Sequence, residues 1–251
     1  MKLMRSFMML AFLLCAGLLS HCSSEEDDPG STLSDEEVLA IYTEVYGASS
    51  VYIEGKYVVV KSNGVPDHKS PYFEGTEWEE DLYEDNSDPG FNQNPNTIAT
   101  QSYIFKIPKN PAEASSKSAT PLGPIGVSLN GVPFFNQYAG PSQPLTNEIT
   151  SFDQYSGHPA QGGQYHYHVE PLSLTTSKGK TALLGFLLDG FPVYGPQENG
   201  KSLTNSDLDS YHGHSHATTE YPEGIYHYHI TSTDPYINGN GFFGTAGTVS
   251  Q

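Results

Sequence analysis

The sequence predicts a mainly β fold, arranged as a duplicated β-rich domain with one short helix near the N-terminus. Glycine (25), proline (18) and tyrosine (17) are abundant among the 251 residues, a composition that favours short strands joined by turns. Apolar runs of strand length are bounded by turn residues. In addition, three blocks of sequence recur in the same order in the second half of the chain, which indicates an internal repeat.

Residues 1–22 have the features of a lipoprotein signal peptide. Lys2 and Arg5 precede an apolar run that is too short to span a bilayer as a stable helix. The run ends in Leu-Ser-His-Cys at residues 19–22, which resembles a bacterial lipobox with Cys22 as the lipid anchor, although His21 replaces the usual small residue. Ordinary signal cleavage at the same place is the alternative. We therefore expect an exported, membrane-anchored lipoprotein at the cell surface or in the periplasm, with the outer membrane favoured.

Charge and cysteine content restrict what the rest of the chain does. Residues 23–32 are polar and acidic and read as a disordered tether, and residues 33–251 form the predicted domain. The formal net charge is -18 and no cluster of Lys or Arg occurs, so nucleic acid is not an expected partner. Cys15 and Cys22 are the only cysteines. Any metal in the domain must therefore be held by histidine and carboxylate.

The first part of the domain predicts a helix followed by a hairpin. Ser34 to Glu37 has a capping-box pattern, and Val38, Ile41, Tyr42 and Val45 then keep one apolar face until Gly47. Apolar runs at 51–53 and 57–60 flank Glu-Gly-Lys and predict a β-hairpin. Residues 75–96 are acidic and turn-rich and are interpreted as a surface excursion, with calcium binding as the minor alternative. Residues 103–108 read as a strand, and residues 110–121 as a polar linker without periodicity.

The second half carries the repeat, over residues about 123–171 and 182–231. The repeated blocks are Leu129–Phe135 with Leu188–Tyr194, the Asp153, Tyr155, Gly157, His158 set with Asp209, Tyr211, Gly213, His214, and Tyr165–His168 with Tyr226–His229. Their separations are nearly constant, so we expect the two halves to be related by a pseudo-two-fold axis. The Asn130-Gly131 and Asp189-Gly190 pairs predict tight turns between strands, with a minor supporting role at the site as the alternative for Asp189.

Histidines are concentrated in the repeated segments. Eight of the ten lie between His158 and His229. Side chains alternate along a strand, so His166 and His168 point the same way, roughly 7 Å apart at Cα, and can converge on one ion. The same holds for His227 and His229. The further ligand candidates are Asp153 and His158 in the first repeat, and Asp209, His212, His214 and His216 in the second.

Imidazole and carboxylate together suit a divalent transition metal, and we expect zinc or copper. Neutral hydrogen-bonded histidines, or a pH switch, are the alternatives without metal. The intervening tyrosines, Tyr165, Tyr167, Tyr226 and Tyr228, are expected to face the core.

At these residues the chain resembles the YHYH protein family, a set of mostly exported bacterial proteins named for this tetrapeptide. The resemblance is carried by Asn63–His68, Gly123–Val127, Leu129–Pro133, Gly157-His158, both Tyr-His-Tyr-His blocks, Pro235-Tyr236 and Gly241–Gly244. Many relatives carry cysteines in this region, so a family disulfide does not transfer to this chain. The resemblance implies a compartment but no reaction, and it adds His68 as a residue that approaches the site.

Three functional hypotheses follow. The first is a metal-binding module for binding, sensing or storage of zinc or copper. The second is a metal-dependent enzyme, a hydrolase or an oxidase, which needs an open position on the metal beside a pocket. The third is a structural surface protein or adhesin without metal. The sequence does not identify a protein partner.

Overall fold

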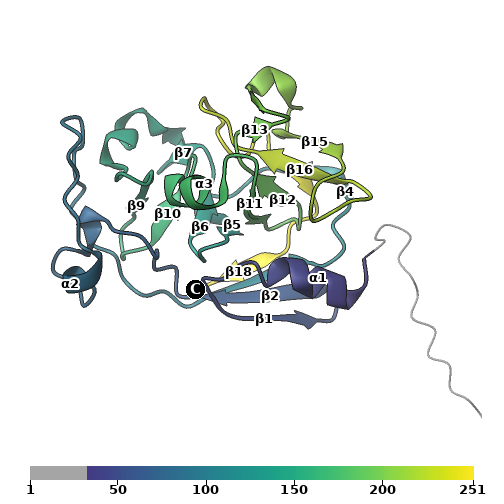
Figure 1. Cartoon of the computed structure of the whole chain (residues 1–251), viewed down its shortest axis with the longest axis horizontal. Coiled ribbons are helices and arrows are strands. Elements are labelled where there is room, and N and C mark those ends of the chain that lie inside the picture. Colours follow the sequence, from purple (N-terminus) through teal and green to yellow (C-terminus); the bar gives the residue numbers. More distant parts are fainter. Residues whose placement is uncertain (1–32) are drawn as a thin grey trace, which may run out of the picture.

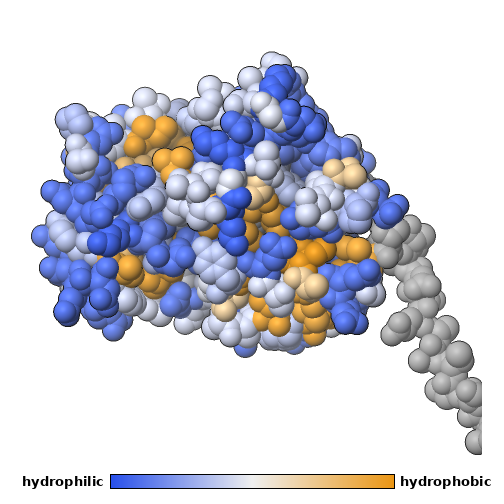
Figure 2. Space-filling model, viewed as in Figure 1, coloured by the Kyte–Doolittle hydropathy of each residue, from blue (hydrophilic) through white to orange (hydrophobic). Residues whose placement is uncertain are grey.

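A computed structural model describes residues 33–251, so the predicted signal peptide, Cys22 and the acidic tether lie outside the described residues. The fold is mainly β, as the composition predicts. Figure 1 shows a four-stranded sheet below a larger sheet, with α1 beside the smaller one. Most of the visible surface is hydrophilic, and apolar residues form separate patches on it (Figure 2).

The N-terminal part forms α1 (Asp35–Tyr42) and most of the small sheet. The predicted capping box is present, since Ser34 Oγ accepts from Glu37 N and the Glu37 carboxylate accepts from Ser34 N. The Tyr42 ring stacks on Phe186 of the large sheet, with ring centroids 4.0 Å apart. The helix ends before Val45, which is nevertheless buried in the turn that follows.

The small sheet is antiparallel, in the order β1-β2-β3-β18. The predicted hairpin and the strand at 103–108 are both confirmed, and Gly55 takes the positive φ of the hairpin turn. The strands are β1 (Ala48–Glu54), β2 (Tyr57–Ser62), β3 (Tyr103–Pro108) and β18 (Thr248–Ser250).

The large sheet has eight strands in the order β15-β16-β12-β11-β5-β6-β10-β9. Read outward from the central antiparallel pair β5/β11, the two halves have the same arrangement: a hairpin, then a parallel neighbour, then an antiparallel edge strand. The strands are β5 (Pro124–Ser128), β6 (Pro133–Phe135), β9 (Gly157–Pro159), β10 (Tyr165–Tyr167), β11 (Leu183–Leu187), β12 (Pro192–Tyr194), β15 (Gly213–His216) and β16 (Ile225–His229).

This strand order agrees with a pseudo-two-fold arrangement of the repeated blocks, while the origin of the two halves by duplication stays a prediction. The Asn-Gly and Asp-Gly pairs close the β5/β6 and β11/β12 hairpins as expected. Gly131 and Gly190 take the positive φ values that such turns need, 81° and 91°. Strands β5 and β11 are fully buried between their neighbours.

The connecting segments are short and irregular. Residues 75–96 hold only α2 as regular structure and are mostly exposed, as predicted. The short elements are η1 (Pro71–Phe73), α2 (Glu79–Leu82), β7 (Tyr138–Ala139), β8 (Gln143–Pro144), η2 (Leu145–Asn147), η3 (Ile149–Ser151), α3 (Leu172–Lys178), β13 (Gln197–Glu198), β14 (Lys201–Ser202) and η4 (Asn205–Asp207).

The prediction of a linker over residues 110–121 is wrong in part, because this segment contains β4 (Glu113–Ser118). It pairs with β17 (Phe242–Gly244), more than 100 residues later in the chain. Its side chains are mostly exposed and show no alternation that would mark a strand. The strand is held by its distant partner, and Lys117 Nζ also donates to the Phe243 carbonyl at 2.8 Å.

Candidate metal centres

The Tyr-His-Tyr-His segments present two chemically different faces. On β10 and β16 the tyrosines point into the core, and all four are less than 10 % exposed. The histidines between them point to the opposite face, as the alternation of a strand requires. Each segment therefore anchors itself through its tyrosines and presents two imidazoles on the other side of the sheet.

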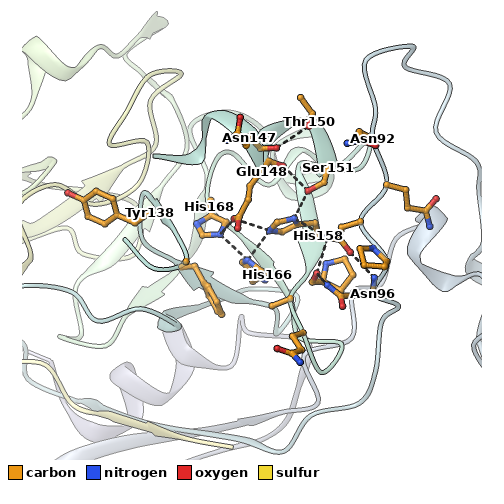
Figure 3. A pocket seen from close by; sticks show the side chains of 18 of the residues that line it. Asn92, Asn96, Tyr138, Asn147, Glu148, Thr150, Ser151, His158, His166 and His168 are labelled. Atoms are coloured by element: carbon orange, nitrogen blue, oxygen red, sulfur yellow. Dashed lines mark hydrogen bonds and ion pairs between the residues drawn. The ribbon is translucent and has the colours of Figure 1, made fainter. Parts of the chain in front are cut away.

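The first centre contains His158, His166 and His168. His158 on the edge strand β9 lies directly opposite His166 on β10. Nε2 of His166 is 3.2 Å from Nε2 of His158 and 2.9 Å from Nε2 of His168. All three side chains are buried, and their rings converge in Figure 3. The three nitrogen atoms thus face one common point.

The other ring nitrogen of each imidazole is bound to oxygen. His166 Nδ1 donates to the Gln164 carbonyl at 2.9 Å, and His168 Nδ1 donates to the Asn136 carbonyl. His158 Nδ1 lies 2.7 Å from Ser151 Oγ, whose own proton goes to the Glu148 carbonyl. The carbonyl partners place the proton on Nδ1 of His166 and of His168. At His158, Nδ1 lies beside the Ser151 hydroxyl and, at 3.4 Å, beside the Asn94 amide nitrogen. The Nε2 lone pairs of His166 and His168 therefore point at each other, and a cation between them would remove their repulsion.

Burial also keeps these imidazoles neutral. It lowers the pKa of His158 to about 3 and that of His168 to about 4, and it holds the pKa of His166 well below its usual range. Neighbouring histidines contribute in the same direction for His158 and His166. A neutral imidazole with a free Nε2 is the form that binds a metal ion.

Glu148 borders the first centre. Its Oε2 lies 3.8 Å from His158 Nε2 and 3.9 Å from His168 Nε2. Ligands on a tetrahedral metal with bonds of about 2.0–2.1 Å are about 3.3–3.4 Å apart, so this oxygen lies just outside that distance. Burial raises the pKa of Glu148. The centre also adjoins a pocket of about 610 Å³.

The second centre contains four histidines and one carboxylate. His227 and His229 lie on β16, and His214 and His216 lie on the neighbouring edge strand β15, with His214 directly opposite His227. Glu198 on β13 contacts His216 Nε2, and its Oε1 is 3.5 Å from His214 Nε2 and 3.8 Å from His229 Nε2. The five potential ligand atoms all lie within 4.8 Å of one another.

The hydrogen bonds of the second centre repeat the pattern of the first. Nδ1 donates to a carbonyl in His227 (Ile225, 2.9 Å), His229 (Gly195, 2.8 Å) and His216 (Ala217, 2.8 Å). Nε2 of His227 and Nε2 of His229 are buried and have no hydrogen-bond partner within the described chain. Buried polar atoms normally have a partner, and a metal ion would supply it for both.

Burial lowers the pKa of His227 to about 3 and that of His229 to about 4, and it lowers the pKa of His214 as well. The two buried rings of the second centre, those of His227 and His229, are therefore neutral at physiological pH. The residues at both centres fit a transition metal by donor type, by protonation state and by spacing.

Comparison with known proteins identifies the family. The model of the YHYH protein family matches residues 104–205 and 198–241, together more than half of the chain. The chain belongs to the YHYH protein family. No curated protein and no solved structure matches it. Across residues 33–251, no helix is both long enough and apolar enough to cross a membrane.

In this YHYH protein seven of the eight candidate histidines gather in two groups. His158, His166 and His168 form one group, and His214, His216, His227 and His229 belong to the other. Each repeat therefore contributes its own centre. That these residues ligate a metal remains a prediction.

Asp153 and Asp209 lie apart from both groups, on the tyrosine face of the sheet. Asp153 Oδ2 accepts from Tyr165 OH at 2.8 Å and from Ser70 Oγ at 2.6 Å. Asp209 Oδ1 accepts from Tyr226 OH at 3.0 Å. Each carboxylate also accepts backbone N–H groups of the turn that follows it. Each aspartate therefore fixes its motif strand through a tyrosine hydroxyl, on the face opposite to the histidines.

A second pair of residues supports the other tyrosines. Asp189 Oδ2 accepts from Tyr228 OH at 2.6 Å and from Gly244 N at 2.9 Å, and burial raises the pKa of Asp189 to about 6. In the first repeat Asn130 Nδ2 donates to Tyr167 OH at 3.1 Å. Both residues belong to the predicted turns, so each turn also fixes one motif tyrosine.

Two other buried histidines stand outside the centres. His68 Nε2 lies 3.0 Å from Tyr167 OH, so this residue approaches the motif strand only from its tyrosine face. His212 Nδ1 donates to the backbone carbonyl of His229 at 2.8 Å, and its side chain is not in the second group.

Sequence reasoning missed Glu148 and Glu198 and left His216 as one candidate among several. The two glutamates come from different places, a 3-10 turn and a short hairpin, and they do not occupy equivalent positions in the repeats. The sequence holds no signal for Glu148. For His216 the signal was present, because His214-Ser-His216 repeats the alternate spacing of the two motif pairs.

Proposed function

We propose that this protein binds one transition metal ion at each of the two centres. The observation that carries the proposal is the direction of the imidazoles. In both motif pairs, His166 with His168 and His227 with His229, Nδ1 donates to a backbone carbonyl, so the Nε2 lone pairs of each pair converge without a proton between them. Hydrogen-bonded core histidines without metal would instead donate to and accept from one another.

The donor set favours zinc or copper. Imidazole dominates both centres, one carboxylate accompanies each, and no cysteine occurs in residues 33–251. Calcium and magnesium prefer shells made entirely of oxygen, whereas imidazole suits zinc, copper, nickel and iron. The resulting role is binding, sensing or storage of such an ion.

Metal analysis of protein purified without a histidine tag or nickel column tests the proposal. We expect about two ions per chain in the wild type, and about one in either double variant, His166→Ala with His168→Ala or His227→Ala with His229→Ala. His68→Gln is the matched control, because this buried histidine lies outside both centres. Full metal content in the variant that carries all four substitutions would leave a structural surface protein without metal as the better account.

The first centre also supports a second candidate function, a metal-dependent enzyme. Three imidazoles leave a coordination position that Glu148 approaches but does not fill, and this position adjoins a pocket. An open position beside a pocket is the arrangement of catalytic metal sites. Zinc would support hydrolysis and copper would support oxidation. Azide added to copper-loaded protein tests for the open position, since it should perturb the copper spectrum of the first centre only.

We further propose that the protein is exported and anchored to the membrane, with the outer membrane favoured. The support is the sequence of residues 1–22 alone, including the lipobox-like segment that ends in Cys22. Labelling of growing cells with a fatty-acid analogue should mark the wild type, and Cys22→Ala should abolish the label. Label retained by Cys22→Ala would contradict the anchor.

A further inference from the structure

The pocket over the first centre is built from separate parts of the chain. It is lined by residues of the 92–96 loop, of the 135–140 region, of the 147–151 turns and of β9 with the loop after it. In Figure 3 the three histidines form one side, and Asn92 and Asn96 lie on the loop that faces them. A molecule in this pocket would therefore lie next to the metal ion.

The side chains of the pocket wall carry little charge. Among the described residues that line it, Glu148 is the single acidic side chain, and no lysine or arginine is present. The metal ion itself would attract an anion, but the wall offers a phosphate, sulfate or carboxylate no charge-assisted hydrogen bond, and the net charge of -18 opposes anions as well. The part of the pocket beyond the ion consequently favours an uncharged ligand.

The polar groups that remain free are mainly amides. Asn92, Asn147 and Gln161 line the pocket, and within the described chain their side chains make no hydrogen bond to protein. An amide side chain both donates and accepts, as a hydroxyl group does. An aromatic side chain lies beside them, because Phe135 also lines the pocket and its ring stacks on that of His166 with centroids 3.9 Å apart. Amides beside an aromatic ring complement a ligand that carries many hydroxyl groups on an apolar frame.

A peptide is less well matched to this place. Peptides commonly bind by adding a strand to a free sheet edge, and β9 is an edge strand of the large sheet. Its outer side is already occupied, because the Asn94 and Asn96 amides donate to the Pro159 carbonyl at 3.0 and 3.1 Å. Ala99 N also donates to the Gly163 carbonyl at 3.0 Å. The 92–99 segment thus takes the position that an added strand would need.

We propose that this pocket binds a neutral saccharide and that a hydroxyl group of the bound sugar faces the metal ion of the first centre. The inference rests on the proposed metal binding and adds the class of ligand to it. It distinguishes the two centres, since among the histidines of both centres only those of the first line this pocket.

Calorimetric titration of the zinc-loaded protein with neutral tetrasaccharides tests the inference. The probes are cellotetraose, maltotetraose, mannotetraose and N-acetylated chitotetraose, with glucose 6-phosphate and trialanine as competitors of the other classes. At least one neutral tetrasaccharide should bind, and Asn147→Ala should weaken that binding about tenfold, the effect of losing one or two hydrogen bonds. Asn92→Ala, on the opposite wall, is a second variant in case the first misfolds.

Two controls separate the pocket from the rest of the protein. Asn110→Ala removes an amide from a different surface depression, and His216→Ala alters only the second centre; both should bind the sugar as the wild type does. Binding of no neutral tetrasaccharide, or tighter binding of glucose 6-phosphate or trialanine, would overturn the inference while leaving metal binding intact. Absence of zinc from the first centre in the same sample would instead overturn the proposed function.

Discussion

The two centres share a strand motif but differ in what surrounds it. At the first, three imidazoles are buried below a pocket and the nearby carboxylate stays just outside ligand distance. At the second, a fourth imidazole and Glu198 bring the number of potential donors to five, and two of the histidines lie on a partly exposed edge strand. The difference comes largely from one position: His216 lies two residues after His214, whereas Ala160 lies two residues after His158.

This comparison shows how one repeated motif lies in two different surroundings. The strand, its tyrosines and the carbonyls that fix Nδ1 are common to both halves, so both halves orient imidazoles in the same way. The number of potential donors differs because His216 on β15 and Glu198 on β13 have no counterpart in the first group. An open shell suits exchange of ligands, and a filled one suits retention of the metal.

Removal of metal should produce the largest change. A ligand that binds only the folded chain stabilises it by about 4 kcal/mol at a concentration one thousand times its Kd. For a domain of this size that corresponds to roughly 8–16 °C in Tm per centre. We expect EDTA to lower the Tm of the zinc-loaded protein in two steps, with the second centre the last to be emptied. Equal Tm values with and without EDTA would contradict both centres.

Acid should destabilise the metal-free protein. The pKa values of His158, His168, His227 and His229 are lowered to about 3 or 4 in the folded chain, whereas the unfolded value is about 6.5. Below pH 6.5 the unfolded state therefore binds more protons, so stability is full above that pH and falls as pH decreases towards 4. Each group contributes up to about 1.4 kcal/mol per pH unit.

Urea unfolding of the metal-free protein at pH 7.5, 6.5 and 5.5 measures this dependence. The variant that carries alanine at the four motif histidines should show a much flatter profile. Asp189 acts in the opposite direction, because burial raises its pKa to about 6 and protonation then favours the folded state, but it is one group against several. A wild-type profile that is flat, or that rises towards acid, would show that these imidazoles are not neutral and buried as described.

Exchanging the residues that differ between the centres should change metal affinity by a smaller factor. A structural zinc site gains about 10–16 kcal/mol from four ligands, or roughly 3 kcal/mol each, but His216→Ala leaves His214, His227, His229 and Glu198 in place. We therefore expect the affinity of the second centre to fall by about 10- to 100-fold. Ala160→His should strengthen the first centre and reduce its response to azide. Competition with a coloured zinc chelator measures both, and unchanged affinities would remove the proposed cause of the difference.

Weakening the hydrogen bonds that the two aspartates accept from the motif tyrosines should have the smallest effect on metal affinity. Asp153→Asn and Asp209→Asn each weaken a hydrogen bond to a motif tyrosine without touching an imidazole. Residues that orient metal ligands typically alter affinity by 10- to 100-fold, and these act one step further away, so we expect about tenfold or less. The same chelator competition reports the change. Complete loss of metal in either variant would mean that the aspartates are ligands after all.

The features that the sequence predicted correctly are specified by residues close together in the chain. The capping box at Ser34, the hairpin around Gly55 and the Asn-Gly and Asp-Gly turns are each specified within a few residues. The alternation of Tyr and His within each motif was enough to assign the faces of β10 and β16. The histidines of both centres were therefore predictable, and so was the mainly β fold.

The features that the sequence did not predict depend on contacts between residues that are far apart in the chain. Strand β4 exists because β17 pairs with it from far along the chain, and its own side chains carry no strand pattern. Glu148 and Glu198 reach the centres from different positions in the segments that follow β6 and β12, so the repeat does not align one with the other. Asp153 and Asp209 recur with the histidines for a reason that the pattern does not reveal, because they bind the tyrosines on the opposite face.

The most direct test of the central claim is the location of metal in crystals. Anomalous scattering recorded at the zinc edge from zinc-loaded protein should give two peaks in each chain. One should lie among the Nε2 atoms of His158, His166 and His168, and the other among His214, His216, His227, His229 and Glu198. Peaks at other places, or none within either group of histidines, would contradict the account.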